Sequence, residues 1–200
     1  TKTTFLENPD SQEIKDHLWG CSWDILFFAG HSSTEGDSGR IYINETESLT
    51  IEEFSRALSN AVAGGLHLAI FNSCDGLGLA SGLQKAQIPQ VIVMREPVPD
   101  LVAQRFLKYL LEALAGRKSL YLAMRQARSR LKEDLEVQFP CASWLPVICQ
   151  NPAVTPAIWP PPILSNSRHL TTVLLLSVAI TASVLGVRLL GELQTWELQA

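Results

Sequence analysis

Two apolar stretches, Trp23-Asp-Ile-Leu-Phe-Phe-Ala-Gly-His31 and Leu66-His-Leu-Ala-Ile-Phe-Asn-Ser-Cys74, decide the fold of this chain. Each is short, rich in aromatic and branched residues, and bounded by Gly, Ser, Asn or Asp. This pattern is typical of a strand that is buried on both faces of a parallel sheet. In such sheets the ligand crevice lies beyond the carboxyl ends of the strands. If these two strands are neighbours, His31 and Cys74 therefore lie together as a nucleophile and its candidate base.

The remainder of the chain alternates between strands and helices. A loop rich in Ser, Gly, Asp and Glu is expected at 31–39. Further strands are expected at 40–44, 90–94 and 144–149, the last at an edge or a bend because it contains proline. We expect helices from Asn8-Pro9 to about Trp19, from the capping box Thr50-Ile-Glu-Glu53 to Gly64-Gly65, and over 77–86, 99–115 and 118–135. The alternation predicts an α/β fold with a mainly parallel sheet and helices on both faces.

Composition limits the possible functions. The chain has 200 residues, 46% hydrophobic and 18% charged, enough for one core and an appendage. Its net charge of -4 and pI near 5.6 give no electrostatic reason to expect a nucleic acid partner. The cysteines have no C-x-x-C pairing, and no histidine lies at metal-ligand spacing from them. We therefore expect no zinc site, no disulfide scaffold, a reducing environment, and packing roles for Cys21, Cys141 and Cys149. No metal or organic cofactor is implied.

The C-terminal quarter changes in character. Residues 151–168 are rich in proline and predict a stiff linker. The 18 residues from Leu170 to Val187 carry no charge, and as a helix they would span about 27 Å, close to the thickness of a bilayer core. We expect one transmembrane helix at 169–190, with 1–168 cytoplasmic and 191–200 opening a truncated extracytoplasmic region; the alternative is a buried helix. The first residues have the character of an N-terminally truncated domain.

Four blocks in a fixed order carry a family resemblance. They are Phe27-Phe-Ala-Gly-His31-Ser, Ile70-Phe-Asn-Ser-Cys74-Asp-Gly, Val91-Ile-Val-Met-Arg-Glu-Pro-Val-Pro-Asp100 and Ala142-Ser-Trp144-Leu-Pro-Val. Together they resemble the CHAT domain, which belongs with the caspase, separase and gingipain-like cysteine peptidases. The resemblance covers roughly residues 5–150 and implies a caspase-like fold. The tail is similar to cyanobacterial proteins in which a membrane helix joins a CHAT domain to a CHASE-type sensor domain.

The resemblance also implies roles for individual residues. It makes His31 the catalytic histidine and Cys74 the nucleophile that attacks a protein or peptide substrate, with the backbone amides of Cys74 and Ser32 or a neighbour holding the oxyanion. Asp100 falls where separase-like members place an acidic residue that selects a basic substrate residue. Asp75, beside the nucleophile, is a candidate for orienting the substrate or for capping a helix. The helix that begins near Leu77 would favour the thiolate of Cys74. The implied function is regulatory proteolysis in signalling, by a membrane-anchored cysteine endopeptidase.

Two other interpretations stay open. Caspase-like enzymes usually have glycine directly after the histidine, so Ser32 favours a catalytically inactive signalling or interaction module. In addition, Gly76-Leu-Gly78-Leu-Ala-Ser81 followed by Glu96 imitates a dinucleotide-binding fingerprint, although its third position is serine and it leaves His31 without a role. A charged set on the helix at 118–135 is expected to be a solvated face: Arg125, Arg128 and Arg130.

Overall fold

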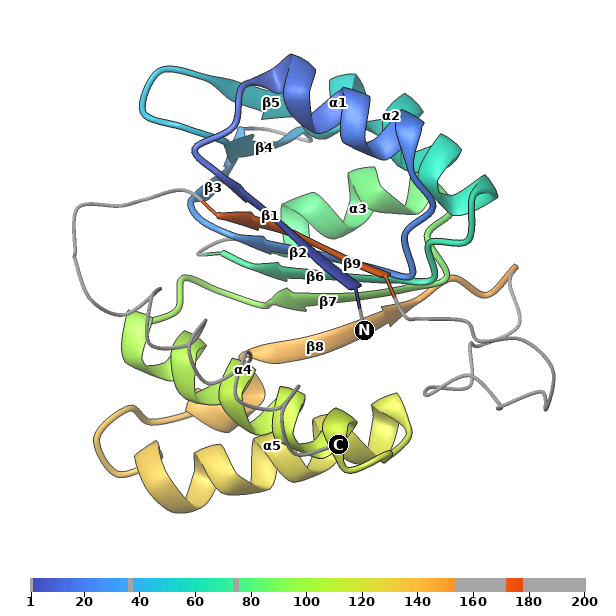
Figure 1. Ribbon diagram of the computed structural model, residues 1–200. Coiled ribbons are helices and arrows are strands. Elements are labelled where there is room, and N and C mark those ends of the chain that lie inside the picture. Colours follow the sequence, from blue (N-terminus) through green and yellow to red (C-terminus); the bar gives the residue numbers. More distant parts are fainter. Residues whose placement is uncertain (1, 36–37, 74–75, 154–171, 178–200) are drawn as a thin grey trace, which may run out of the picture.

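Helices cover both faces of one central sheet in the computed structural model, which describes residues 2–35, 38–73, 76–153 and 172–177 (Figure 1). In chain order the elements are β1 (Lys2–Glu7), α1 (Ser11–Gly20), β2 (Ile25–Ala29), β3 (Ser32–Glu35), β4 (Ser38–Tyr42), β5 (Ser48–Thr50), α2 (Ile51–Ala63), β6 (Leu68–Asn72), α3 (Leu77–Lys85), β7 (Gln90–Met94), α4 (Asp100–Ala115), α5 (Leu120–Leu135), the 3-10 helix η1 (Ala142–Trp144), β8 (Pro146–Gln150) and β9 (Thr172–Ser177).

The central sheet has the strand order β1-β9-β2-β6-β7-β8, and all its pairs are parallel except β7 with β8. This confirms the predicted α/β fold with a mainly parallel sheet. Strand β8 lies at the edge and begins with Pro146, as the proline predicted. The predicted loop at 31–39 is wrong in part, because β3 lies within it and pairs with β4 as an antiparallel hairpin in a second sheet, β3-β4-β5.

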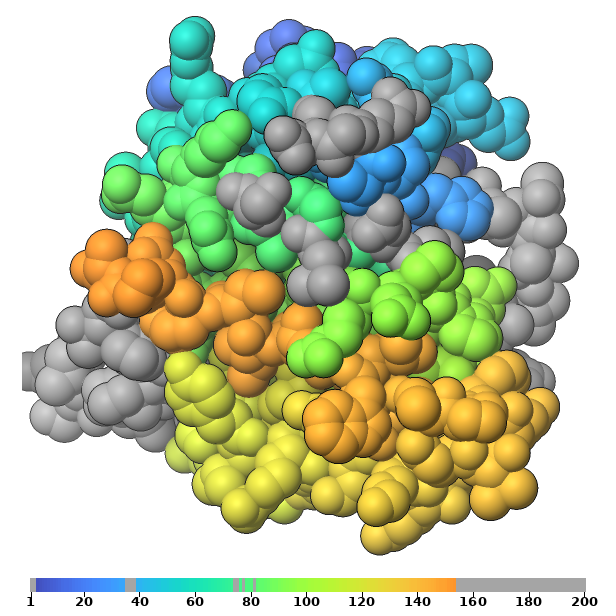
Figure 2. Space-filling view, turned by 180° about the vertical axis from the view of Figure 1, so that it is seen from behind, coloured from blue at the N-terminus to red at the C-terminus, as the bar shows by residue number. Residues whose placement is uncertain are grey.

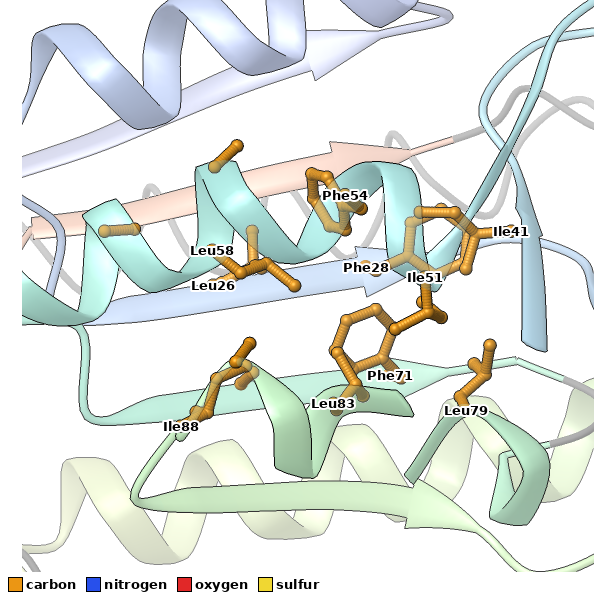
Figure 3. Packing of buried hydrophobic residues seen from close by; sticks show 14 of the residues in the cluster. Leu26, Phe28, Ile41, Ile51, Phe54, Leu58, Phe71, Leu79, Leu83 and Ile88 are labelled. Atoms are coloured by element: carbon orange, nitrogen blue, oxygen red, sulfur yellow. The ribbon is translucent and has the colours of Figure 1, made fainter. Parts of the chain in front are cut away.

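Two apolar layers hold the helices on the sheet. On one face, Leu26 and Phe28 of β2 and Phe71 of β6 pack with α1, α2 and α3. Figure 3 shows this contact from close by, with the rings of Phe28 and Phe71 next to each other and 5.9 Å apart between centroids. On the other face, alternate residues such as Ile25 pack with α4 and α5. Both layers were expected, because the strands are apolar on both sides.

The helix caps predicted from the sequence are confirmed for α2 and wrong for α1. The capping box of α2 is present: the side chain of Thr50 accepts from the N–H of Glu53, and Glu53 accepts from the N–H of Thr50. The predicted start of α1 is wrong, because its cap is Asp10, whose carboxylate accepts from the N–H of Glu13 at 2.7 Å. Asn8 instead has φ of 48°, a left-handed turn that asparagine tolerates.

Part of the predicted membrane segment is a strand. Residues 172–177 form β9, which lies between β1 and β2 and is parallel to both. Within the part of the chain that the structure describes, no helix is both long and apolar enough to cross a bilayer. The transmembrane helix predicted at 169–190 is therefore not confirmed, and its other residues, like 154–168 of the linker and 191–200, lie outside the described ranges.

Candidate active site

Strands β2 and β6 are neighbours, which is the condition on which His31 and Cys74 were expected to lie together. They pair in register from Ile25 opposite Leu68 to Ala29 opposite Asn72, and the N–H of Gly30 continues the ladder to the carbonyl of Asn72 at 3.5 Å. His31 follows at once, with an exposed side chain. Cys74 and Asp75 lie outside the described residues, so the structure places the two strand ends together and leaves the thiol itself undescribed.

A pair of serine hydroxyl groups joins the two strand ends. The hydroxyl of Ser32 donates to the hydroxyl of Ser73 at 2.8 Å, and the two residues are only 8% and 2% exposed. The carbonyl of His31, between β2 and β3, accepts from the N–H of Tyr42 at 3.0 Å. Hydrogen bonds therefore hold His31 and Ser32 to β4 and to Ser73, the residue before Cys74. Sequence reasoning did not find this contact, because nothing in the sequence relates Ser32 to Ser73.

Ser32 has an ordinary extended backbone. It is the first residue of β3 and is not among the residues with positive φ. Because His31 and Tyr42 form a hydrogen-bonded pair of the hairpin, Ser32 opposite Ile41 falls in the alternate class of pair, so its N–H is directed away from β4. The backbone conformation at position 32 is one that serine adopts without strain, so it does not require glycine.

Two glycines pack the start of α3 against neighbouring strands. A Cβ atom on Gly76 would lie 2.5 Å from the carbonyl oxygen of Met94, and one on Gly78 would lie 1.9 Å from Oγ1 of Thr34. The N–H of Gly76 also donates to that carbonyl of Met94, at 3.0 Å. The space that a pyrophosphate would use in a dinucleotide fingerprint is thus filled by this chain's own atoms. The glycines serve close packing, which argues against the dinucleotide-binding interpretation.

The polar groups around the strand ends are incompletely paired. Oγ1 of Thr34 and Oδ1 of Asn72 are buried, and neither has a hydrogen-bond partner among the residues described. Unpaired buried polar atoms cost free energy and are few in native proteins. In the same described ranges, no group of three or more His, Cys, Asp or Glu side chains is placed to hold a metal ion.

A sequence model of the CHAT domain matches residues 1–167 of the chain. The chain belongs to the CHAT domain family. This confirms the resemblance drawn from the four blocks and relates the chain to the caspase-like cysteine peptidases. No curated protein matches it.

The third block of the CHAT domain leads into α4. Asp100 is exposed and opens that helix after Pro99, where a carboxylate is favoured by the helix dipole. The carboxylate of Asp100 makes no hydrogen bond or ion pair with another described residue. Strand β7 is parallel to β6, so the β7–α4 connection leaves the sheet at the edge where His31 lies. The position suits the predicted substrate contact, which stays a prediction.

The remaining cysteines differ in exposure. Cys21 and Cys141 are exposed, so the prediction that both are packing residues is wrong. Cys149, on β8, is half-buried and packs against the core, which confirms its predicted role. Burial raises the pKa of the Cys149 thiol above its ordinary value. Two exposed thiols therefore compete with Cys74 for any thiol reagent.

Helix α5 does not present a uniform solvated face. Arg130 forms an ion pair with Glu112 and lies over the ring of Tyr109. Nε of Arg128 donates to the carbonyl of Ser143 at 2.7 Å, and its guanidinium lies 5.4 Å from the ring centroid of Trp144. The predicted solvated face is wrong for these two arginines and holds for Arg125, which is exposed. Trp144 itself is 60% exposed.

Proposed function

We propose that this CHAT domain is a cysteine endopeptidase in which Cys74 is the nucleophile and His31 transfers the proton. The observation that carries the proposal is the in-register pairing of β2 with β6, which ends with Ala29 opposite Asn72. Each proposed catalytic residue follows its strand end by two positions. The Ser32 to Ser73 hydrogen bond supports the proposal further, because it joins the residue after His31 to the residue before Cys74.

The proposed reaction has two stages. The thiolate of Cys74 attacks the carbonyl carbon of the scissile bond, and the N–H groups of Cys74 and of Ser32 or a neighbour hold the oxyanion. The C–N bond breaks, the leaving amine takes a proton from the His31 imidazolium, and a thioester remains. His31 then removes a proton from water, which attacks the thioester and releases a carboxylic acid and the free thiol. No metal or organic cofactor takes part.

The substrate is a protein or peptide whose residue before the scissile bond is basic, with Asp100 as its partner. Asp75 orients the substrate, since the N-cap residue of α3 is Gly76 and the predicted capping role of Asp75 is wrong. The carboxylate of Asp100 suits this role because it is exposed and no ion pair within the described chain uses it. We assign the activity to regulatory proteolysis in signalling.

The test is covalent labelling of Cys74 by an arginine-bearing, thiol-reactive peptide probe. The protein carries Cys21→Ser and Cys141→Ser, because both of these thiols are exposed. We expect labelling at Cys74 that is lost in Cys74→Ala and falls at least about tenfold in His31→Ala. If Cys74 reacts no faster than the half-buried Cys149, the peptidase proposal is wrong and a catalytically inactive interaction module is the better account.

The proposal extends to membrane attachment through residues 169–190, with 1–168 cytoplasmic and a sensor domain as a partner. The uncharged length of the segment supports it. Residues 172–177 cannot be a membrane helix and strand β9 at the same time, so attachment requires them to leave the sheet. Flotation of the chain with lipid vesicles tests this: protein that stays at the bottom of the gradient contradicts attachment.

A further inference from the structure

A basic groove lies between α5 and the edge strand β8, and His31 is not among its lining residues. It has a volume of about 640 Å³. Four of its lining residues are cations: Arg95, Arg125, Arg128 and Lys132. Its aromatic lining residues are Tyr121 and Trp144. In Figure 2, orange residues of the β8 region lie next to the yellow residues of α5.

The positive charge of the groove is largely uncompensated. No carboxylate is among its described lining residues, although the whole chain has a net charge of -4. Arg125 and Lys132 are exposed and lie seven residues apart on one face of α5, with Arg128 between them. The side chains of Arg95, Arg125 and Lys132 form no ion pair within the described residues. The acidic side chain of Glu136 lies near Lys132, but it already accepts from the N–H groups of Cys141 and Ser143.

The groove also offers backbone groups for pairing. Among the described strands, β8 pairs only with β7. The N–H of Arg95 donates to the carbonyl of Leu145, and the N–H of Asn151 donates to the carbonyl of Pro89. These two bonds show which residues of β8 form hydrogen-bonded pairs with β7, and such pairs occur at every second residue. By that alternation the N–H and C=O of Ile148 are directed away from β7, toward the outer edge. An extended peptide can add to such an edge through main-chain hydrogen bonds.

We propose that this groove binds an extended acidic segment of a partner protein. The segment pairs with the edge of β8 at Ile148, and its carboxylates on alternate positions meet the cations of α5. Trp144, exposed beside Arg128, supplies an apolar contact at one end. A strand of five residues covers about 17 Å, the length of β8.

The observations favour a peptide over other occupants. Single-stranded nucleic acid would use the cations and Trp144, but it has no backbone N–H and C=O groups to pair with Ile148. A second copy of this chain, paired through β8 about a two-fold axis, would bring the cations of two grooves toward each other. An acidic peptide satisfies both the charge and the strand edge.

The location links the groove to the proposed function. Arg95 follows β7 directly, at the sheet edge where Gly76 donates to Met94 and where His31 lies. If the peptidase proposal holds, a partner bound in the groove can extend toward the sheet edge that carries His31. Binding itself does not depend on catalysis, so it is measured on the full chain carrying Cys74→Ala.

The experiment uses fluorescence anisotropy with a labelled octapeptide of alternating glutamate and valine, because alternation places all glutamates on one face of a strand. We expect saturable binding that weakens with salt. The double variant Arg125→Glu/Lys132→Glu should lose at least about tenfold in affinity. The matched variant Arg56→Glu/Arg105→Glu changes two exposed arginines elsewhere by the same total charge and should stay within about twofold.

Further probes distinguish an acidic peptide from the other candidate occupants of the groove. A peptide with lysine in place of glutamate should not bind, and peptides N-methylated at every second residue, made in both registers, should bind more weakly in the register that blocks pairing. Equal binding by the lysine peptide, tighter binding by an eight-nucleotide oligothymidine, or dimerisation that hides the groove overturns the proposal. Undiminished binding by the charge-reversed groove variant does so too.

Discussion

The hydroxyl of Ser32 donates a hydrogen bond to the hydroxyl of Ser73, and this bond joins the first residue of β3, directly after His31, to the residue before Cys74. Both serines are buried, and they are 41 positions apart in the chain. The bond crosses between the β3-β4-β5 sheet and the central sheet. It therefore fixes the distance between two segments that belong to different sheets, at the place where the proposed chemistry occurs.

Ser32→Ala should lower both stability and reactivity. We expect a loss of about 1 kcal/mol in the free energy of unfolding, because one buried hydrogen bond is removed. Labelling of Cys74 by the peptide probe should slow, since the two strand ends are no longer tied. Urea unfolding and labelling rates check this. Ser33→Ala, next to it, removes only an exposed contact with Tyr42 and should change stability by less than about 0.5 kcal/mol. Equal effects of the two variants would contradict the prediction.

Gly78→Ala should be destabilising by about 1–3 kcal/mol, because its methyl group would overlap Thr34. A second change, Thr34→Ala, should recover part of this loss by making room. Gly20→Ala is the control: a Cβ there meets nothing within 4 Å, and alanine should be neutral or slightly stabilising. Thermal unfolding compares the variants. A Gly78→Ala protein as stable as Gly20→Ala would refute the packing argument.

Cys149 should be alkylated more slowly than Cys21 and Cys141. Burial raises its pKa, so less thiolate is present near neutral pH, and its side chain is less accessible. Its rate should keep increasing as the pH is raised toward and above the ordinary thiol pKa. Mass spectrometry of iodoacetamide-treated protein gives the three rates. Equal rates in the folded protein would show that Cys149 is not buried.

Glu53 should make the stability depend on acid pH. Hydrogen bonds from the backbone and side chain of Thr50 lower the pKa of this carboxyl from its ordinary value of 4.5. The stabilisation is present above 4.5 and is lost as the pH falls through the lower folded-state pKa. Glu53→Gln should flatten this acid dependence. Glu45→Gln, an exposed carboxylate outside any helix, should leave it unchanged. Urea titrations at a series of pH values test this.

Strand β9 should stabilise the sheet in water. A chain ending at Ser177 retains the pairing of β9 with both β1 and β2, whereas one ending at Ala153 leaves β1 without its neighbour. We expect the shorter chain to lose at least about 2 kcal/mol in the free energy of unfolding. Hydrogen exchange should also be faster at the amides of residues 25–29. Equal stability and exchange would mean that β9 adds nothing to the sheet.

Much of the fold could be predicted because its signals are local. The bounds of β7 were correct, and α4 and α5 differed by one or two residues, since apolar periodicity and caps lie within each segment. The capping box at Thr50 needs only residues three positions apart in sequence order. The errors came where local rules compete. The N-cap of α1 is Asp10, not Asn8. Part of the apolar segment that was predicted to be a membrane helix is strand β9, which lies between β1 and β2.

The sequence by itself determined the α/β class, the two buried strands that precede His31 and Cys74, and the family resemblance, because burial patterns and short motifs lie in consecutive residues. Only the tertiary structure decided that Ser32 bonds Ser73, that Gly78 makes room for Thr34, and that cations of α5 gather along the edge of β8. These contacts join residues far apart in the chain. Their existence depends on how strands and helices pack, and no local pattern specifies that packing.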